Sequence, residues 1–391
     1  MRAVYCSPST TFTAVPNQAW PLGFISMRTC RPRLAVLSLA QETKPQRLAP
    51  HGRIATLAVP SAIFHSPVGS GDEETIANAA AVARTVVAPV SNQSGATAAS
   101  IARQGAEIMT WTVGARPLLW EARPEVWAET APLLFPIVGW TRNGEVRVDR
   151  KSYPLALHGF ARHRAFRLEA HAGDRAIFAL SSDDQTRALY PFDFRFTIEY
   201  RVGEGSLSTE IIVTNTGERP MPYACGLHPG FRWPFAGGAP DDYRLCFARA
   251  ENPDVPRIAP GGLISRERRR LPLEGRVLPL GPALFDNDAL CFLDAASHSV
   301  RFEAPDGAAI EVESEDFPHF GVWCRPGNGY LCIEQWTGFS DPEDFAGDLF
   351  AKPSMRVLPP GAVARHAAHY RYKAAPDRGP DSLAAGQKPD K

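Results

Sequence analysis

From about residue 96 onward, the chain is a series of short runs in which apolar and polar side chains alternate, each run ending at Gly, Pro, Asn or Asp. The clearest run is FRFTIEYRV, residues 194–202, in which every second side chain from Phe194 to Val202 is apolar. This period of two predicts a half-buried antiparallel strand with one face against a core. Similar runs recur as ATAASIA, AEIMTWTV, LSTEIIVTNT, SVRFEA, AIEVESE, GVWC and YLCIEQW.

Turn and helix signals between these runs complete the pattern. The segment RFEAPDGAAIEV, residues 301–312, carries Asp306-Gly307 between two apolar runs and predicts a β-hairpin. The best helical segment is 342–350, with Ser340 or Asp341 as N-cap and Pro342 at the first position. Many short strands with regular turns predict an all-β fold of the β-sandwich type.

The two ends of the chain differ from this β-rich middle. Residues 1–40 contain no Asp or Glu, and the run DEETIANAAAVARTVV, residues 72–87, predicts one short Ala-rich helix. We expect residues 1–85 to be an N-terminal extension, either disordered, a transit peptide, or coding sequence read from too early a start. Residues 86–373 form the expected β-sandwich domain. Residues 374–391 are polar and rich in Pro and Gly, which predicts a disordered tail.

Charge and cysteine content exclude several classes of function. The 42 basic and 42 acidic residues give a formal net charge of zero, so neither nucleic acid nor an anionic membrane surface is an expected partner. No apolar run approaches the length of a membrane span. The seven cysteines are an odd number without CxxC spacing, which favours neither a zinc site nor a disulfide framework. A reducing, cytoplasmic location is expected.

The run YLCIEQW, residues 330–336, is the segment in which chemistry is most strongly indicated. It predicts an interior strand, and it contains one full charge, Glu334, which is costly in an apolar strand unless it is compensated. Glu334 shares a face with Trp336, Cys332 and Tyr330 because side chains alternate along a strand. Two interpretations are open: a core glutamate paired with a buried Arg, or a carboxylate that works on a sugar held beside aromatic rings.

Two histidine-containing segments are further candidates. In LHGFARHR, residues 157–164, His158 and Arg162 lie on one face if the segment is extended, although a surface loop with ordinary basic residues is equally compatible. In GLHPGFRWPF, residues 226–235, Pro229 restricts His228 to an extended conformation among glycines and aromatic residues. A histidine that only caps a turn is the alternative there.

Acidic and aromatic clusters give weaker signals. The turn FDNDAL, residues 285–290, places Asp288 before an apolar strand, a pattern that Asx turns commonly explain. The block FPIVGW, residues 135–140, follows three other tryptophans, and such clusters are either core or a platform for the apolar face of a sugar.

Other enzyme classes lack their motifs. The sequence has no GxSxG elbow, no P-loop and no dinucleotide fingerprint in a strand–turn–helix context. Glu334 and Asp288 could supply the two carboxylates of a glycosidase, so hydrolysis stays an alternative.

Taken together, these segments resemble the aldose 1-epimerase (galactose mutarotase) family, in particular its divergent subgroup found beside lactose-use genes. The resemblance runs from about residue 96 to 372, and its landmarks come in the family's order. They are GAEIMTWTV, WAETAPLLFPIVG, LHGFARHRAF (similar to HGFAR), GLHPGFRWPF (similar to HPxFR), FDNDALCF, YLCIEQWTG (similar to IEPW) and RVLPPGAVARHAAHYRY. The family fold is a large antiparallel β-sandwich with its site on a concave face.

The resemblance implies roles for individual residues. Glu334 matches the family's catalytic base, His228 its catalytic acid, and His158 its substrate-binding histidine. Asp288 matches an acidic sugar contact, less securely because Asp286 lies two residues away. We therefore expect interconversion of the α and β anomers of a free hexose, with the acid and the base on opposite sides of the sugar and with neither cofactor nor metal. Arg162 and Trp336, on the faces of His158 and Glu334, complete the expected substrate-binding set.

Two departures from the family pattern bear on the choice of sugar. Trp140 stands where many relatives have Arg after the FPIVG block, and the glutamate strand reads IEQW instead of IEPW. Two alternative functions stay open. One is mutarotation of a sugar phosphate, suggested by Arg162, Arg164 and Arg232, because Arg grips phosphate well. The other is a carbohydrate-binding protein that kept the groove and lost catalysis.

Overall fold

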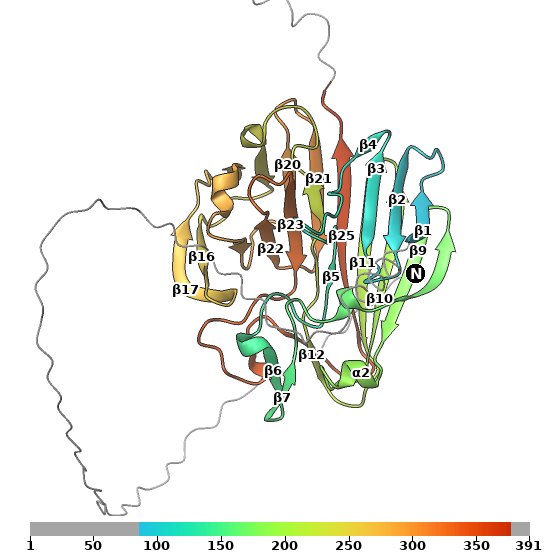
Figure 1. The fold of residues 1–391 in the computed structure, drawn as a ribbon, viewed down its shortest axis with the longest axis vertical. Coiled ribbons are helices and arrows are strands. Elements are labelled where there is room, and N and C mark those ends of the chain that lie inside the picture. Colours follow the sequence, from blue (N-terminus) through green and yellow to red (C-terminus); the bar gives the residue numbers. More distant parts are fainter. Residues whose placement is uncertain (1–85, 377–391) are drawn as a thin grey trace, which may run out of the picture. The chain divides into compact units, whose positions relative to one another are not determined.

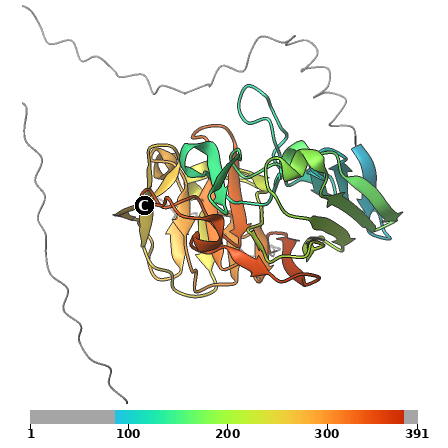
Figure 2. The ribbon, with the colours of Figure 1, turned by 90° about the horizontal axis from the view of Figure 1, so that it is seen from below.

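A computed structural model of the protein describes residues 86–376, in which the regular secondary structure is almost entirely β-strand (Figures 1 and 2). The residues before and after this range, including most of the predicted helix 72–87 and most of the predicted tail, lie outside the described part. The larger sheet has nine strands in the order β18 (Val277–Pro279), β15 (Arg244–Phe247), β20 (Ser299–Glu303), β21 (Ala309–Glu315), β25 (Val363–Lys373), β11 (Ser206–Asn215), β10 (Phe194–Gly203), β9 (Arg175–Ser181) and β8 (Arg167–Ala172).

A second sheet carries the segments in which chemistry is expected. Its strands follow the order β19 (Leu290–Phe292), β22 (His319–Trp323), β23 (Tyr330–Trp336), β13 (Gly226–Leu227) and β5 (Leu133–Leu134), and β14 (Gly230–Arg232) also pairs with β23. A four-stranded sheet consists of β1 (Val86–Ser91), β2 (Thr97–Ala102), β3 (Ile108–Val113) and β4 (Arg116–Pro117). Three two-stranded pairs are β12 (Met221–Tyr223) with β24 (Arg356–Leu358), β16 (Asp254–Ala259) with β17 (Leu263–Arg270), and β6 (Glu145–Val148) with β7 (Lys151–Pro154).

Helices are only short turns between strands in the described residues. They are α2 (Asp184–Arg187) and the 3₁₀ turns η1 (Arg142–Gly144), η2 (Ala161–His163), η3 (Pro240–Asp242), η4 (Pro282–Phe285) and η5 (Leu349–Ala351). None of the helices in this part of the chain is long and apolar enough to cross a membrane. The β1–β3 strands and the β16–β17 hairpin lie at opposite ends of the sandwich in both views (Figures 1 and 2).

The main core fills the space between the two large sheets. The alternation predicted for residues 194–202 is present in β10, whose apolar side chains from Phe194 to Val202 are buried. From the other sheet, Leu331 and Ile333 of β23 join the same core, and Phe231 of β14 packs on Tyr370 of β25 with ring centroids 5.8 Å apart. The prediction of a large antiparallel β-sandwich is therefore confirmed, as is the 301–312 hairpin, in which β20 pairs with β21 across Asp306-Gly307.

The helix predicted for residues 342–350 is wrong. The start of this segment pairs with β17 instead of continuing as a helix: Ile264 N–H donates to Asp341 O at 2.9 Å, and Glu343 N–H donates to Ile264 O at 2.9 Å. Pro342 thus forms a parallel bridge with β17, and only Leu349–Ala351 turns as a 3₁₀ helix. The N-cap signal was misleading because the side chain of Asp341 has a tertiary partner.

That partner is Lys352, whose ammonium Nζ lies 2.7 Å from Asp341 Oδ1. Both side chains are almost fully buried, and burial lowers the pKa of Lys352 although the Asp341 carboxylate opposes the shift. Asp341 Oδ2 also accepts a hydrogen bond from Arg142 N–H at 2.8 Å, so the pair links the 340–352 segment to the loop after residue 139. A buried pair with this geometry is costly to break from one side, because the remaining charge has no compensation.

We expect Lys352→Met to destabilise the protein by about 3–5 kcal/mol, because it leaves the Asp341 carboxylate buried without its cation. Urea unfolding of Lys352→Met, of Asp341→Asn and of the double variant measures the coupling free energy between the two side chains. The double variant should recover part of the loss. If Lys352→Met unfolds at the wild-type urea concentration, the ion pair has no part in holding this loop.

Candidate functional site

The two faces of β23 point into different environments. Gln335 faces the interior of the sandwich, where its Oε1 accepts from Tyr370 Oη at 2.8 Å and its Nε2 donates to Ile333 O at 2.8 Å. Glu334 and Trp336, one residue either side of Gln335, line a cavity on the opposite face. The predicted alternation along residues 330–336 is therefore present. Every residue of β23 is buried, and the alternation places the charged Glu334 on the face that lines the cavity instead of in the apolar core.

The cavity has a volume of about 640 Å³. The segments around it come from distant parts of the sequence, namely the loop near Gly139, the turn after β13, the turn before β19, the β16–β17 hairpin and β23. The structure thus brings every site residue predicted from the sequence to one cavity: Glu334, His228, His158, Arg162, Asp288 and Trp336.

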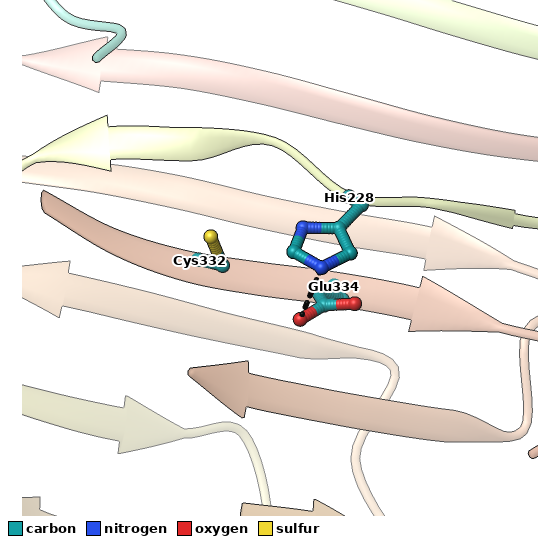
Figure 3. Close-up of side chains that lie close together, drawn as sticks. All are labelled: His228, Cys332 and Glu334. Atoms are coloured by element: carbon teal, nitrogen blue, oxygen red, sulfur yellow. Dashed lines mark ion pairs between the residues drawn. The ribbon is translucent and has the colours of Figure 1, made fainter. Parts of the chain in front are cut away.

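At the buried end of this cavity, Glu334 and His228 are in direct contact. Nε2 of His228 lies 3.2 Å from Glu334 Oε1 (Figure 3). Trp336 Nε1–H donates to Glu334 Oε2 at 2.9 Å. Glu334 is 2 % exposed, and no Arg forms an ion pair with it among the described residues. The interpretation of Glu334 as a core charge neutralised by Arg is therefore wrong.

Burial controls the proton affinities of this pair. It raises the pKa of Glu334 well above the ordinary carboxyl value, although the hydrogen bond from Trp336 acts in the opposite direction. Burial, with a smaller contribution from the nearby Arg162, lowers the pKa of His228 to about 3. These opposite shifts favour a protonated carboxyl beside a neutral imidazole.

The position of His228 follows from strand pairing. The short strands β13 and β14 both pair with β23, and His228 and Pro229 are the two residues between them, so the imidazole is held next to Glu334. A Cβ at Gly230 would lie 2.6 Å from the ring of Trp127, so only glycine lets that indole pack close to His228. The ring centroids of Trp127 and His228 are 5.3 Å apart. His228 Nδ1 is buried with no hydrogen-bond partner in the described part of the chain.

His158 is held in a defined protonation state. Gly139 N–H donates to His158 Nδ1 at 3.0 Å, so Nδ1 must be unprotonated and the proton of the neutral ring is on Nε2. Burial lowers its pKa well below the ordinary value, and His228 and Arg162 add to the shift. The backbone of His158 has a φ of 61°, and its ring lies at 5.5 Å, centroid to centroid, from that of His228. His158 therefore offers a fixed hydrogen-bond donor.

One geometric expectation has to be corrected. The acid and the base were expected on opposite sides of the sugar, but His228 and Glu334 are adjacent on one wall of the cavity, as Figure 3 shows. The reason is local: β14, β13 and β23 are neighbours in one sheet, and their side chains on the same face are close together.

The arginines suggested for phosphate binding are placed differently from one another. Arg162 lines the cavity, and its Nη1 lies 3.0 Å from Glu129 Oε2. Arg164 is hydrogen-bonded to Gln185, and Arg232 faces Glu121 at 3.9 Å. Neither of these two lines the cavity. The cavity therefore has one of the three arginines, and that one is already paired with a carboxylate.

The acidic turn at the mouth of the cavity is stabilised by local hydrogen bonds and is also part of the lining. Asp288 has a φ of 70°, and its Oδ1 accepts from the N–H of Ala289 at 2.7 Å. Arg269 fixes the turn by donating to the carbonyl oxygens of Asp288 at 2.9 Å and Ala289 at 3.1 Å. Asp286 lines the cavity as well.

The two departures from the family pattern have different consequences. Gln335 lies on the sandwich side of β23 and does not reach the cavity. Trp140 does line the cavity, and 43 % of its surface is exposed. Only the second departure can therefore affect what is bound.

Several residues of the site were missed from the sequence. Glu129 falls within the WAETAPLLFPIVG block, and that position in the block was its only signal. Trp127, in the same block, was noted only as one of several tryptophans that could be core or a sugar platform. Arg269 belongs to the run RERRR, which reads as a solvated strand and gives no sign that one guanidinium holds the acidic turn.

One metal-ligand set is present in the described residues. His228, Cys332 and Glu334 each bring one ligand atom, and these atoms lie within 4.8 Å of one another. Figure 3 shows Cys332 and Glu334 on the same face of β23. Burial, together with the Glu334 carboxylate, raises the pKa of the Cys332 thiol well above its ordinary value. An ion could bind only by displacing that proton, because the thiolate is the form that ligates metal.

Comparisons with known proteins identify the family of the chain. The aldose 1-epimerase family model matches residues 90–255. The chain is 32 % identical to protein LacX (plasmid) of Lactococcus lactis subsp. lactis over 253 residues, which is 62 % of this chain and 85 % of LacX. It matches the X-ray structure of a galactose mutarotase-related enzyme from Lactobacillus acidophilus with a TM-score of 0.67 and 30 % identity, over 74 % of this chain and 98 % of that one. A galactose mutarotase-like protein from Lactobacillus casei gives a TM-score of 0.69 and 25 % identity, over 74 % and 100 % of the two chains. The chain therefore belongs to the aldose 1-epimerase family.

Proposed function

We propose that the protein is an aldose 1-epimerase that interconverts the α and β anomers of a neutral aldose such as a free hexose. The observation that carries this proposal is the 3.2 Å contact between His228 Nε2 and Glu334 Oε1 at the buried end of the cavity. An acid and a base that share one proton are what ring opening requires.

The reaction moves two protons and leaves the enzyme unchanged. Glu334, as a carboxylate, accepts the proton of the C1 hydroxyl while His228, as an imidazolium, donates one to the ring oxygen. The bond between C1 and the ring oxygen breaks, the C1–C2 bond rotates, and the two transfers run in reverse to close the other anomer. The C1 hydroxyl oxygen and the ring oxygen are both bonded to C1, so adjacent groups on one wall can serve both.

The protonation state of the pair fits this scheme. A carboxylate with an imidazolium holds as many protons as a carboxylic acid with a neutral imidazole, so transfer across the contact turns one form into the other. The raised pKa of Glu334 favours the neutral form in the empty cavity. The Trp336 N–H, which hydrogen-bonds Glu334 Oε2, stabilises the carboxylate when it forms.

The surrounding groups support a neutral sugar over a sugar phosphate. His158 Nε2–H and Arg162 are donors for sugar hydroxyls, and Asp286 and Asp288 are acceptors at the mouth. A phosphate would meet these two carboxylates, and of the two arginines in the lining, Arg162 and Arg325, the first is already paired with Glu129. Glycoside hydrolysis needs a second carboxylate at the scissile bond, and Oδ1 of Asp288 is engaged by its own turn.

Glu334→Gln should reduce the enzymatic rate by about 10²-fold or more, the usual scale for one positioned acid or base. The measurement is polarimetric relaxation of fresh α-glucose and α-galactose. Glu313→Gln, an exposed position on β21, is the matched control and should match the wild type. Wild-type relaxation no faster than buffer for either sugar, with sugar binding seen by calorimetry, would instead indicate a carbohydrate-binding protein without catalysis.

The pH dependence should follow the shared proton. Activity should persist well below the ordinary histidine pKa of 6.5. The Glu334–His228 pair takes up its second proton, on His228, only near the His228 pKa of about 3. Activity should fall as pH rises through the raised pKa of Glu334, because the pair then loses its only proton. The check is the relaxation rate minus the buffer rate between about pH 4 and pH 9. An acid limb at the ordinary histidine value would contradict this protonation scheme.

Glu334→Gln should also stabilise the fold selectively at high pH. The folded pKa of Glu334 is raised, so its stabilising protonated form is fully present below the unfolded value of 4.5 and is lost as pH rises through the folded pKa. Glutamine never ionises. The stability of the variant relative to the wild type should therefore increase as the pH rises from the unfolded pKa of Glu334 to its folded pKa. Urea unfolding at about pH 4 and about pH 8 tests this difference. Equal differences at both pH values would show that ionisation of Glu334 carries no folding cost.

A further inference from the structure

The cavity extends well beyond the groups that perform the proposed chemistry. Glu334 and His228 are 2 % and 7 % exposed, whereas Trp140, on the same lining, is 43 % exposed. A volume of about 640 Å³ falls within the range of about 300–1,000 Å³ that encloses a drug-sized ligand. A single hexose is much smaller than such a ligand, so a hexose on the buried pair leaves the outer part of the cavity unfilled.

Trp140 is held rigidly although it is exposed. The backbone N–H of Trp140 donates to Ser340 Oγ at 2.9 Å, and the backbone carbonyl oxygen of Trp140 accepts from Asp341 N–H at 2.8 Å. Its indole ring rests on Gly262, in the turn between β16 and β17, where φ is +75° and a Cβ would overlap the ring. Position 262 therefore requires glycine for two reasons: its backbone has a positive φ, and the indole of Trp140 leaves no room for a Cβ.

Trp140 is a large apolar side chain that is exposed at the mouth of the cavity. Five large apolar side chains stand out as exposed in the described residues, and Trp140 is the one among them that lines the cavity. The β16–β17 hairpin adds Ile258 and Ile264 to the same lining, so Trp140 belongs to an apolar wall. Asp286 and Arg325 contribute charged groups to the lining. An apolar ring surface with hydrogen-bonding groups nearby suits a pyranose, which has an apolar C–H face and a rim of hydroxyls.

We propose that the outer part of the cavity is a second sugar subsite, with Trp140 as its platform, and that the preferred substrate is a neutral reducing disaccharide. This inference rests on the proposed function. The reducing-end aldose occupies Glu334 and His228, where its ring opens and closes. The second glycosyl unit stacks on Trp140, and its glycosidic bond is neither formed nor broken.

The test compares kcat/KM for fresh α-lactose and α-maltose with kcat/KM for α-galactose and α-glucose, measured by polarimetry. The wild type should favour the disaccharides. Trp140→Ala should lower the ratio of disaccharide to hexose kcat/KM by about tenfold, which corresponds to about 1.4 kcal/mol. Trp140→Phe keeps an aromatic face and should retain most of the ratio. The change should appear chiefly in KM, because Trp140 is remote from the proton transfers. Circular dichroism melting of both variants separates lost stacking from lost folding.

The outcomes distinguish this inference from the function on which it rests. If hexoses relax faster with enzyme and disaccharides do not, the second subsite is refuted and the epimerase proposal stands. The same holds if folded Trp140→Ala lowers both classes equally. If neither class of sugar relaxes faster than in buffer, the proposed function fails and the subsite assignment fails with it.

Discussion

The contact between the Glu334 carboxyl and the His228 imidazole is the constraint around which the site is built. A carboxylate that is 2 % exposed is destabilising by itself, and here its partners are an imidazole and an indole N–H rather than a guanidinium. Such partners compensate for burial less completely than a bidentate arginine would. The carboxyl consequently keeps a high proton affinity, and this is the property that a group exchanging protons near neutral pH needs.

The sandwich supplies the rigidity that this contact requires. Gln335, the neighbour of Glu334, bonds across the interior to Tyr370 of β25, which ties β23 to the nine-stranded sheet. On the other side, β13 and β14 both pair with β23 and fix the backbone on each side of His228. The glutamine that departs from the family's IEPW pattern thus has a structural explanation: it fastens the strand of the proposed base, and it does not face the sugar.

Much of this arrangement was predictable from the sequence, because it depends on periods and turns that act locally. The alternation in β10 and the placement of Glu334 and Gln335 on opposite faces of β23 followed from the period of two, and the 301–312 hairpin followed from its Asp-Gly turn. The convergence of His158, His228 and Asp288 could be expected only through the resemblance to a family, since no local rule brings together residues that lie 60 to 130 positions apart in the sequence. The helix expected at 342–350 failed for the same physical reason. Its N-cap residue, Asp341, forms a buried ion pair with Lys352, and its backbone bonds to β17 and to Trp140.

The loop that includes Trp140 shows how the deep and the outer parts of the cavity are coupled. Gly139 donates its N–H to His158 Nδ1, and the next residue, Trp140, is bonded to Ser340 and Asp341. The backbone that orients a proposed sugar-binding histidine is therefore continuous with the backbone that presents the indole at the mouth. Asp341 is in turn neutralised by Lys352, so one buried ion pair supports both. Because the backbone of Trp140 is hydrogen-bonded to Ser340 and Asp341 and its indole packs on Gly262, a sugar in the proposed subsite would lose little affinity to the ordering of this side chain. A preformed platform of this kind lets the substrate range change at the mouth, through Trp140 and the β16–β17 hairpin, while the proton-transfer pair stays unchanged.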